Sequence, residues 1–187
     1  MVLVIFLRFI VRGVLRKTAG FLDAGFAIRL TPASVQAIIT RAANAAESEY
    51  DQLKQKIRDA RIIYADETSF SVLGKNWWVW VFRSDDNMLF VIRNSRGNNV
   101  LEEILGKAYS GILVCDCWRA YDFLSNAQIQ RCWAHLLRKS KELCESVPGR
   151  HFHEKLTELF DEIKQFNLKE HTEKQRLRKY KQMTIKL

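Results

Sequence analysis

The chain has 187 residues, of which 48% are hydrophobic and 27% are charged. Its two prolines and eight glycines exclude a collagen-like or linker-rich chain, and the composition is that of one globular domain with an appendage. The net charge of +9 at pH 7 favours a polyanionic partner.

The basic side chains are concentrated toward the two ends of the chain. Residues 1–60 carry nine basic and five acidic side chains, residues 61–124 carry seven and eight, and residues 125–187 carry fourteen and eight. This distribution favours basic arms that hold an anionic polymer around a more acidic centre. Three unrelated stretches of solvated surface would give the same distribution.

Residues 1–11 are almost wholly apolar, with Arg8 as the interruption. A membrane span needs about 20 apolar residues. A signal peptide places its positive charge before the apolar run, whereas here Arg12, Arg16 and Lys17 follow it. We therefore expect a helix that packs on another element or another chain and no membrane partner, with contact to a membrane surface as the alternative.

Residues 1–60 are expected to form a helical region. Short helices are predicted over residues 18–24 and 31–45, with a turn at Gly25, an N-cap at Thr31 and Pro32 at the first helical position. Two helices around a turn are compatible with a helix-turn-helix, whose second helix enters the DNA major groove. In that case Arg41 is a candidate DNA contact. A hairpin that only packs would show the same pattern.

Residues 61–147 are predicted to form an α/β core. Strands over 61–73, 77–83 and 88–93 are expected to form an antiparallel meander. The run 111–115 is typical of a buried central strand, and a fifth strand is expected at 129–133, with helices over 98–108, 121–125 and 134–147. This order predicts a mixed sheet with helical N- and C-terminal extensions. It is the strand order of a ribonuclease-H-like fold, and other α/β domains have the same order. Residues 148–187 are expected to be a basic helical tail.

Two aspartates stand out by their positions in this pattern. Asp66 lies inside the first strand, and Asp116 lies at the end of the fourth. A carboxylate that faces a sheet is costly unless it is paired or bound to a cation. If the two strands are neighbours, the pair can bind Mg²⁺ or Mn²⁺ and act on a phosphodiester. Alternatively, Asp66 starts a turn with Thr68 and Ser69, and Asp116 caps the following helix.

The four cysteines lie within residues 115–144, which is unlike a disulfide scaffold and favours a cytoplasmic protein. Cys115, Cys117, Cys132 and His135 are zinc ligand types. Their spacing departs from the usual Cys-x-x-Cys knuckle, so buried free thiols are the preferred interpretation.

Three short strings carry a family resemblance. They read Ala-Asp-Glu-Thr at 65–68, Asp-Cys-Trp-Arg-Ala-Tyr at 116–121 and Cys-Trp-Ala-His at 132–135. In this order they resemble the central domain of the insertion-sequence-66 family of DDE transposases. The resemblance covers residues 16–143, and the Asn-Ser-Arg string at 94–96 resembles the serine-arginine stretch of the same family.

The resemblance implies a ribonuclease-H-like fold that cuts and joins DNA strands with an Asp-Asp-Glu triad and Mg²⁺. Asp66 and Asp116 match the first two acids and would be both catalytic and metal-binding. His135 matches a position that packs beside the site or contacts phosphate. The implied partners are element ends and target DNA, with a homo-oligomer and a nucleoid-associated location as further expectations.

The sequence also departs from the family pattern. Cys117 and Trp118 stand where the family has glycine and tyrosine, and no convincing third acid follows, since Glu154, Glu158 and Glu162 have the spacing of a solvated helix face. The sequence therefore predicts a truncated transposase. One alternative is a DNA-binding remnant without catalysis, and another is a nuclease that completes its site with Glu67 or a helical glutamate. The basic tail contributes four candidate DNA contacts: Lys174, Arg176, Arg178 and Lys179.

Overall fold

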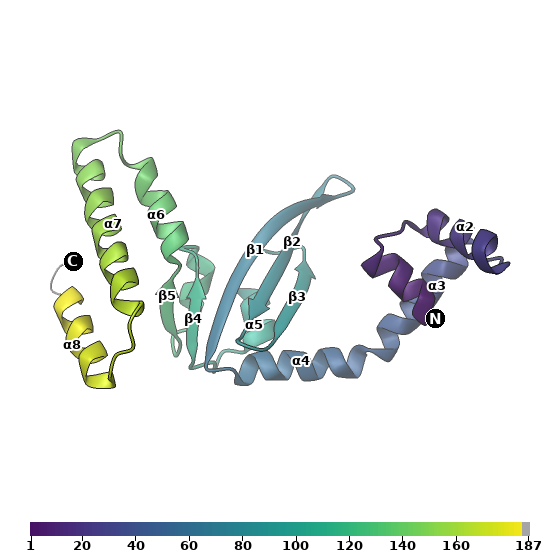
Figure 1. Cartoon of the computed structure of the whole chain (residues 1–187), viewed down its shortest axis with the longest axis horizontal. Helices are drawn as coiled ribbons and strands as arrows, with labels where there is room; N and C mark the ends of the chain where they lie inside the picture. Colours follow the sequence, from purple (N-terminus) through teal and green to yellow (C-terminus); the bar gives the residue numbers. More distant parts are fainter. Residues whose placement is uncertain (185–187) are drawn as a thin grey trace. The chain divides into compact units, whose positions relative to one another are not determined.

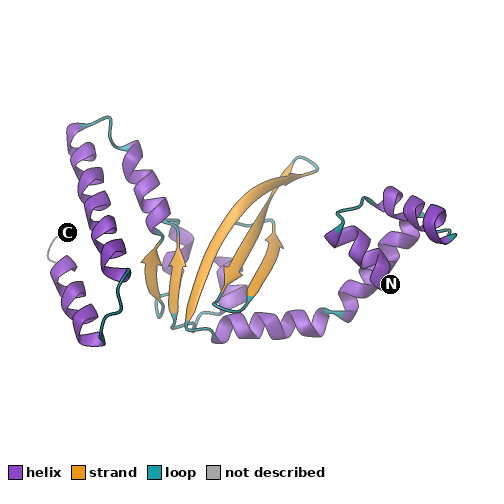
Figure 2. Ribbon diagram, viewed as in Figure 1, coloured by secondary structure: helices purple, strands orange, loops and turns teal. Residues whose placement is uncertain are grey.

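The computed structural model describes residues 1–184, with side chains as far as residue 182. The chain divides into two compact units at the boundary between Asp59 and Ala60. Figure 1 gives the order of the elements along the chain, and Figure 2 shows that the first unit is helical while the second contains the strands.

The first unit is built from helices in the order α1 (Val2–Ile5), a π-helical turn η1 (Phe6–Ile10), α2 (Leu15–Phe26), α3 (Pro32–Ala45) and α4 (Glu47–Asp59). The predicted start of α3 is confirmed: the Thr31 side chain accepts a hydrogen bond from the Ser34 amide, and Pro32 occupies the first turn. The predicted turn at Gly25 is wrong. Helix α2 continues to Phe26 and ends at Ala27, whose φ of 54° is left-handed.

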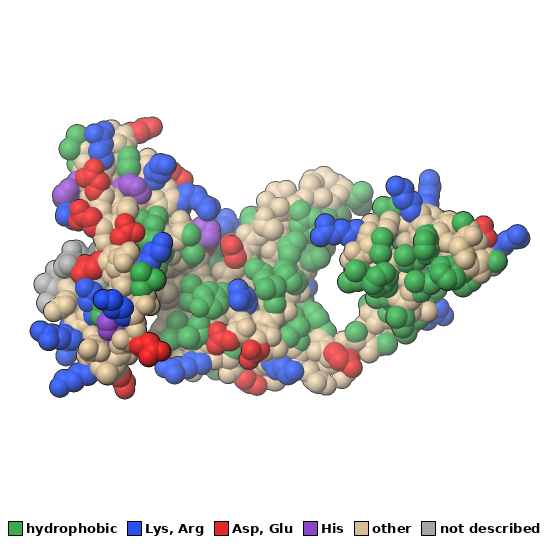
Figure 3. All heavy atoms as spheres, in the orientation of Figure 1, with side chains coloured by type: hydrophobic (Ala, Val, Ile, Leu, Met, Phe, Trp, Pro, Cys, Tyr) green, Lys and Arg blue, Asp and Glu red, His purple; other side chains and the backbone are tan. Residues whose placement is uncertain are grey.

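The apolar N-terminus is part of the core of this first unit. Val4 and Leu7 are buried in one cluster with Ala19, Leu22 and Val35, which come from α2 and α3. This confirms the prediction that the apolar run packs on another element. Large hydrophobic side chains on its outer side stay exposed, and they gather on the face shown in Figure 3. Within residues 1–184, no helix has the length and apolar character that a membrane crossing requires.

The second unit is organised around a five-stranded mixed sheet. Its strands are β1 (Ile62–Val72), β2 (Lys75–Arg83), β3 (Met88–Arg93), β4 (Ile112–Cys115) and β5 (Gln128–Arg131), and they lie in the order β3-β2-β1-β4-β5. The first three strands pair antiparallel, whereas β4 pairs parallel with β1 and β5 pairs parallel with β4. The predicted α/β class, with a meander followed by crossover strands, is confirmed at this level.

One face of this sheet forms the core of the second unit. Alternate side chains of its strands are fully buried there, among them Ile63, Trp80, Phe82, Leu89 and Leu113. Two elements between β3 and β5 also contribute buried side chains, helix α5 (Asn98–Leu105) and the 3₁₀ helix η2 (Arg119–Phe123). Because side chains alternate along a strand, residues between the buried positions point to the other face, where Tyr64, Phe90 and Ile92 are about half exposed.

Three helices follow β5 in the part of the chain that the structure describes: α6 (Trp133–Glu142), α7 (Val147–Asn167) and α8 (Glu173–Thr184). The predicted helix over 134–147 is too long, because α6 ends at Glu142. Pro148 does not break a helix but lies in the first turn of α7, where its missing N–H is no loss, and Ser146 caps that helix. Helices α6 and α7 pack through Trp133 and Phe160, whose ring centroids are 5.4 Å apart.

Candidate active site

Asp66 lies on β1, and Asp116 directly follows β4, the parallel neighbour of β1. In the register of β1 and β4, Tyr64 pairs with Val114, and each aspartate follows two residues later. Adjacent strands are about 4.8 Å apart, so the two aspartates lie near each other where β4 ends beside β1. Both line a cavity of about 270 Å³, together with His135 of α6. The structure thus brings together the two acids singled out in the sequence.

The two turn-forming alternatives can be compared with this geometry. Strand β1 continues as far as Val72, so Asp66 lies inside a strand and does not start a turn with Thr68. Asp116 does organise the chain that follows it, because its Oδ1 accepts a hydrogen bond of 2.8 Å from the Trp118 amide. Trp118 is the residue before η2, so Asp116 holds the turn that leads into this helix.

Glu67 lies on the opposite face of β1 from its neighbour Asp66, because side chains alternate along a strand. Its side chain is fully buried, and its Oε1 accepts a hydrogen bond of 2.7 Å from Arg96 Nε. The Tyr121 hydroxyl of η2 donates to Oε2 of the same carboxylate. The suggestion that Glu67 completes a metal site with Asp66 is therefore not supported, since Glu67 is held by an arginine and a tyrosine.

Burial dominates the electrostatics of this internal group. It raises the pKa of Glu67, and the hydrogen bonds from Tyr121 and Arg96 oppose that rise without cancelling it. Burial and the adjacent Glu67 carboxylate raise the pKa of Tyr121 well above its ordinary value. The tyrosine therefore keeps its proton and acts as the donor in this pair.

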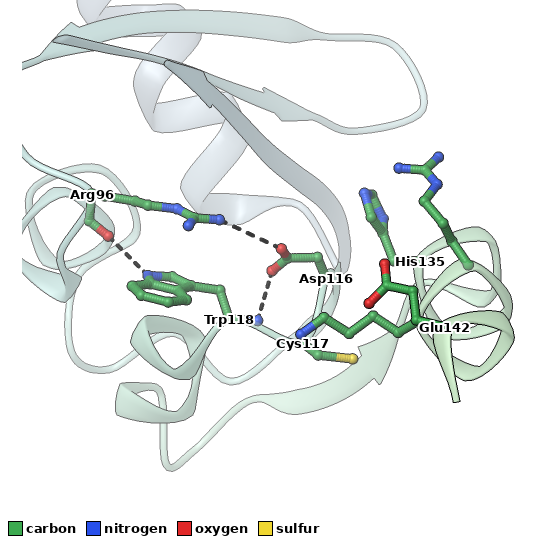
Figure 4. Close-up of a pocket in the computed structure, with 8 residues that line it drawn as sticks. Arg96, Asp116, Cys117, Trp118, His135 and Glu142 are labelled. Carbon is green, nitrogen blue, oxygen red and sulfur yellow. Dashed lines mark hydrogen bonds and ion pairs between the residues drawn. The ribbon is translucent and has the colours of Figure 1, made fainter. Parts of the chain in front are cut away.

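Arg96 connects the buried carboxylate to the site. Its guanidinium lies over the rings of Trp78 and Trp118, at 4.8 Å and 4.2 Å from their centroids. Its Nη2 lies 3.8 Å from Oδ2 of Asp116, and its carbonyl oxygen accepts a hydrogen bond from Nε1 of Trp118 (Figure 4). Sequence reasoning noted Arg96 only through the Asn-Ser-Arg string and missed its pairing with Glu67.

A second cavity, of about 330 Å³, opens on the other side of Asp116. Trp118 lines it, and so do four residues of α6 at spacings of three, four and seven, which place them on one helix face: His135, Arg138, Lys139 and Glu142. His135 thus lines both cavities, and its Nδ1 is buried without a hydrogen-bond partner among the described residues. The sequence did not single out Arg138 and Lys139 as part of a site.

The cysteines are free thiols, as the preferred interpretation expected, but only Cys115 is fully buried. Burial raises the pKa of Cys115 to about 12, so it remains a protonated thiol. Within residues 1–184, no three His, Cys, Asp or Glu side chains are arranged to hold a metal ion. The zinc alternative therefore gains no support.

The candidate DNA contacts differ in their surroundings. Arg41 on α3 and Lys174, Arg176 and Arg178 on α8 are exposed. Lys179 is instead ion-paired with Glu162 of α7 and lies 5.8 Å from the ring of Phe166. Basic and acidic side chains are mixed over the helices α7 and α8 in Figure 3, so the tail is not a uniformly basic surface.

The sequence of this chain matches a known protein family. The family described as Transposase IS66 matches residues 4–186, which is nearly the whole sequence. The chain belongs to this family. The resemblance predicted from the three strings is thereby confirmed.

Two individual proteins show more limited likeness. The uncharacterized protein y4qI of Sinorhizobium fredii (strain NBRC 101917 / NGR234) is 28% identical over 50% of this IS66-family chain, which spans 22% of that protein's length. A chain in the cryo-EM structure of the simian T-cell lymphotropic virus intasome, in complex with PP2A regulatory subunit B56 gamma, is similar with a TM-score of 0.33 and 12% identity. That match covers 50% of this chain and 41% of the other.

Proposed function

We propose that this chain carries the phosphoryl-transfer centre of a DNA transposase in a ribonuclease-H-like fold, with Asp66 and Asp116 as its first two acids. One observation carries the proposal: Asp66 of β1 and Asp116, the residue after the parallel neighbour β4, line one cavity. Membership of the transposase family supports it independently. The strand order, an antiparallel meander extended by two parallel strands, agrees with the proposed fold.

The donor set of this pair suits a divalent cation. Two carboxylates that line one cavity repel each other unless positive charge lies between them. Mg²⁺ in proteins is typically bound by one or two carboxylates, with substrate phosphates and waters as the other ligands. Asp66 and Asp116 therefore fit Mg²⁺ or Mn²⁺. When bound, such ions activate the attacking oxygen and stabilise the leaving oxygen of a phosphodiester.

Two neighbouring residues orient Asp116. The amide of Trp118 fixes one oxygen of Asp116, and Arg96 lies close to the other. Among the described residues no third carboxylate joins the pair. Glu158 and Glu162 on α7 are paired with Lys155 and Lys179. The sequence-based predictions of a truncated copy and of a third acid elsewhere stay predictions.

Metal-dependent stability tests the proposed site. If Mg²⁺ or Mn²⁺ binds the folded chain and not the unfolded chain, the unfolding temperature rises with the concentration of the cation. Asp66→Asn and Asp116→Asn are expected to abolish this rise, whereas Asp86→Asn, an exposed carboxylate in the turn after β2, is expected to keep it. Cleavage of DNA strands by the purified chain that is lost in each of the two site variants would show that a third acid lies within this chain. Equal metal response in all four proteins would refute the site.

A second candidate function is DNA binding without catalysis, favoured by the exposed cations of α8. A protein that neutralises phosphates loses affinity with salt, with a logarithmic slope of about −0.9 per contact. Replacing Lys174, Arg176 and Arg178 by glutamine should weaken binding to unrelated duplexes about equally and make the slope shallower by about 2 to 3. A slope that does not change would remove α8 from the interface.

A matched charge control accompanies that experiment. Arg29, Lys56 and Lys75 are exposed cations outside α8, and replacing them by glutamine lowers the net charge by the same three units. This variant is expected to keep most of the salt slope. The helix α3 is tested separately: Arg41→Gln should change the preference among DNA sequences if α3 reads the major groove, and an unchanged preference would leave α3 a packing role.

A further inference from the structure

The cavity of about 330 Å³ beside Asp116 combines one aromatic wall with cations presented by a single helix face. Arg138 and Lys139 are exposed at this cavity and come from α6, while Trp118 comes from the turn after β4. Volumes from about 300 Å³ upward are typical of sites for small ligands. The cavity is therefore in the size range of a site for one small ligand group such as a nucleotide.

Trp118 is held in place although its side chain is 41% exposed. Three contacts fix it: its amide donates to Asp116, its indole Nε1 donates to the carbonyl of Arg96, and the Arg96 guanidinium covers its ring at 4.2 Å. Arg96 covers one face of the ring, so a base can stack only on the other face, and the fixed position of the ring lowers the entropic cost of stacking.

We propose that this cavity binds one unpaired nucleotide of a DNA strand, with its base against Trp118 and its phosphate at Arg138 and Lys139. The inference rests on the proposed function and deepens it, because it places an unstacked nucleotide next to Asp116. Stacking on an aromatic side chain tolerates any base, since every base has a π face. Asp116 and Glu142 repel a phosphate, so the phosphate is directed to the cationic side of the cavity.

An unpaired base is required by the geometry of recognition. A base inside a duplex has both faces covered by its neighbours and cannot lie against Trp118 until it leaves the stack. Leaving costs a few kcal/mol in a duplex and little at a single-stranded overhang. The cavity therefore gives the protein a preference for DNA with unpaired nucleotides over fully paired DNA.

The test compares a fluorescently labelled blunt duplex with the same duplex carrying a three-nucleotide overhang, with EDTA present so that cleavage plays no part. Base–aromatic stacking contributes about 1–3 kcal/mol, which corresponds to roughly 5- to 150-fold in affinity. The full chain is expected to bind the overhang at least about fivefold more tightly. Trp118→Ala should abolish the preference, so that the overhang and the blunt duplex are bound with equal affinity, and Trp118→Phe should keep most of it.

Phe152→Ala is the matched control, because Phe152 is an exposed aromatic residue on α7 outside the cavity, and it should keep the preference. Arg138→Gln together with Lys139→Gln should reduce binding to the overhang more than to the blunt duplex. Equal affinity of the wild-type chain for both DNAs would overturn this inference alone, as would an unchanged preference in folded Trp118→Ala. Absence of binding to either DNA would overturn it together with the proposed function.

Discussion

Arg96→Ala tests the internal ion pair. The substitution removes the cation that pairs with Glu67 at 2.7 Å and leaves a fully buried carboxylate with Tyr121 as its hydrogen-bond donor. Removing one partner of a buried pair costs about 3–5 kcal/mol, because the other charge stays buried and uncompensated. Arg96 itself is 32% exposed, so water can enter the vacated space, and a loss of about 2–4 kcal/mol in unfolding free energy is expected.

Urea unfolding followed by tryptophan fluorescence measures this loss of unfolding free energy in the second unit, which contains Glu67 and Arg96. All five tryptophans lie between residues 77 and 133, so the signal reports on the sheet and not on residues 1–59. The double variant Arg96→Ala with Glu67→Gln should be more stable than Arg96→Ala alone, because the amide removes the stranded charge. Additive losses in the two single variants would show that the two residues are not coupled.

The same pair predicts a dependence on pH. Burial raises the folded-state pKa of Glu67 above its ordinary value of 4.5, so the folded chain binds this proton more tightly than the unfolded chain does. Stability relative to Glu67→Gln is therefore greatest below pH 4.5 and falls as the pH rises through the folded-state pKa. In Arg96→Ala the fall should be larger, since the opposing guanidinium is gone. A difference in unfolding free energy from Glu67→Gln that does not change between pH 4 and 8 would refute the reasoning.

Three further substitutions test the helices. Thr31→Ala removes the cap that accepts from the Ser34 amide and should cost about 1 kcal/mol, seen in thermal unfolding followed by far-ultraviolet circular dichroism. Gly149→Ala would place a Cβ 1.9 Å from the Leu143 carbonyl oxygen, so the start of α7 must shift, at a cost of about 1–3 kcal/mol in urea unfolding. Gly20→Ala meets no atom within 4 Å and should stabilise α2 by about 0.5–1 kcal/mol; a destabilised variant would contradict this.

The sheet could be predicted from the sequence because its strands are long or strongly apolar and are separated by short turns. The positions of Asp66 and Asp116 followed from the same pattern. Asp66 lies inside the first strand, and Asp116 directly follows the fourth strand, which is the parallel neighbour of the first. The helix ends were predicted less well. Ala27 carries a left-handed conformation that alanine rarely adopts, so no local signal marks the end of α2.

The buried pairing of Glu67 with Arg96 was not predictable in the same way. Glu67 and Arg96 are 29 positions apart, and their pairing depends on where the loop after β3 lies relative to β1. Alternation alone places Glu67 opposite Asp66, but it does not say which of the two faces is buried. That choice is made by the apolar side chains of the whole sheet, which bury the face of Ile63 and Trp80.

The neighbouring acids Asp66 and Glu67 therefore differ in the groups that can neutralise their charge. Asp66 faces a cavity, where a cation from solution can reach it, whereas Glu67 faces the core, where only a side chain can neutralise it. Arg96 serves this second acid at 2.7 Å and reaches Asp116 only at 3.8 Å. Since Coulomb attraction falls with distance and rises with burial, Arg96 is held mainly by Glu67. Under the proposed function, a divalent cation that binds Asp116 would therefore not have to displace Arg96 from Glu67.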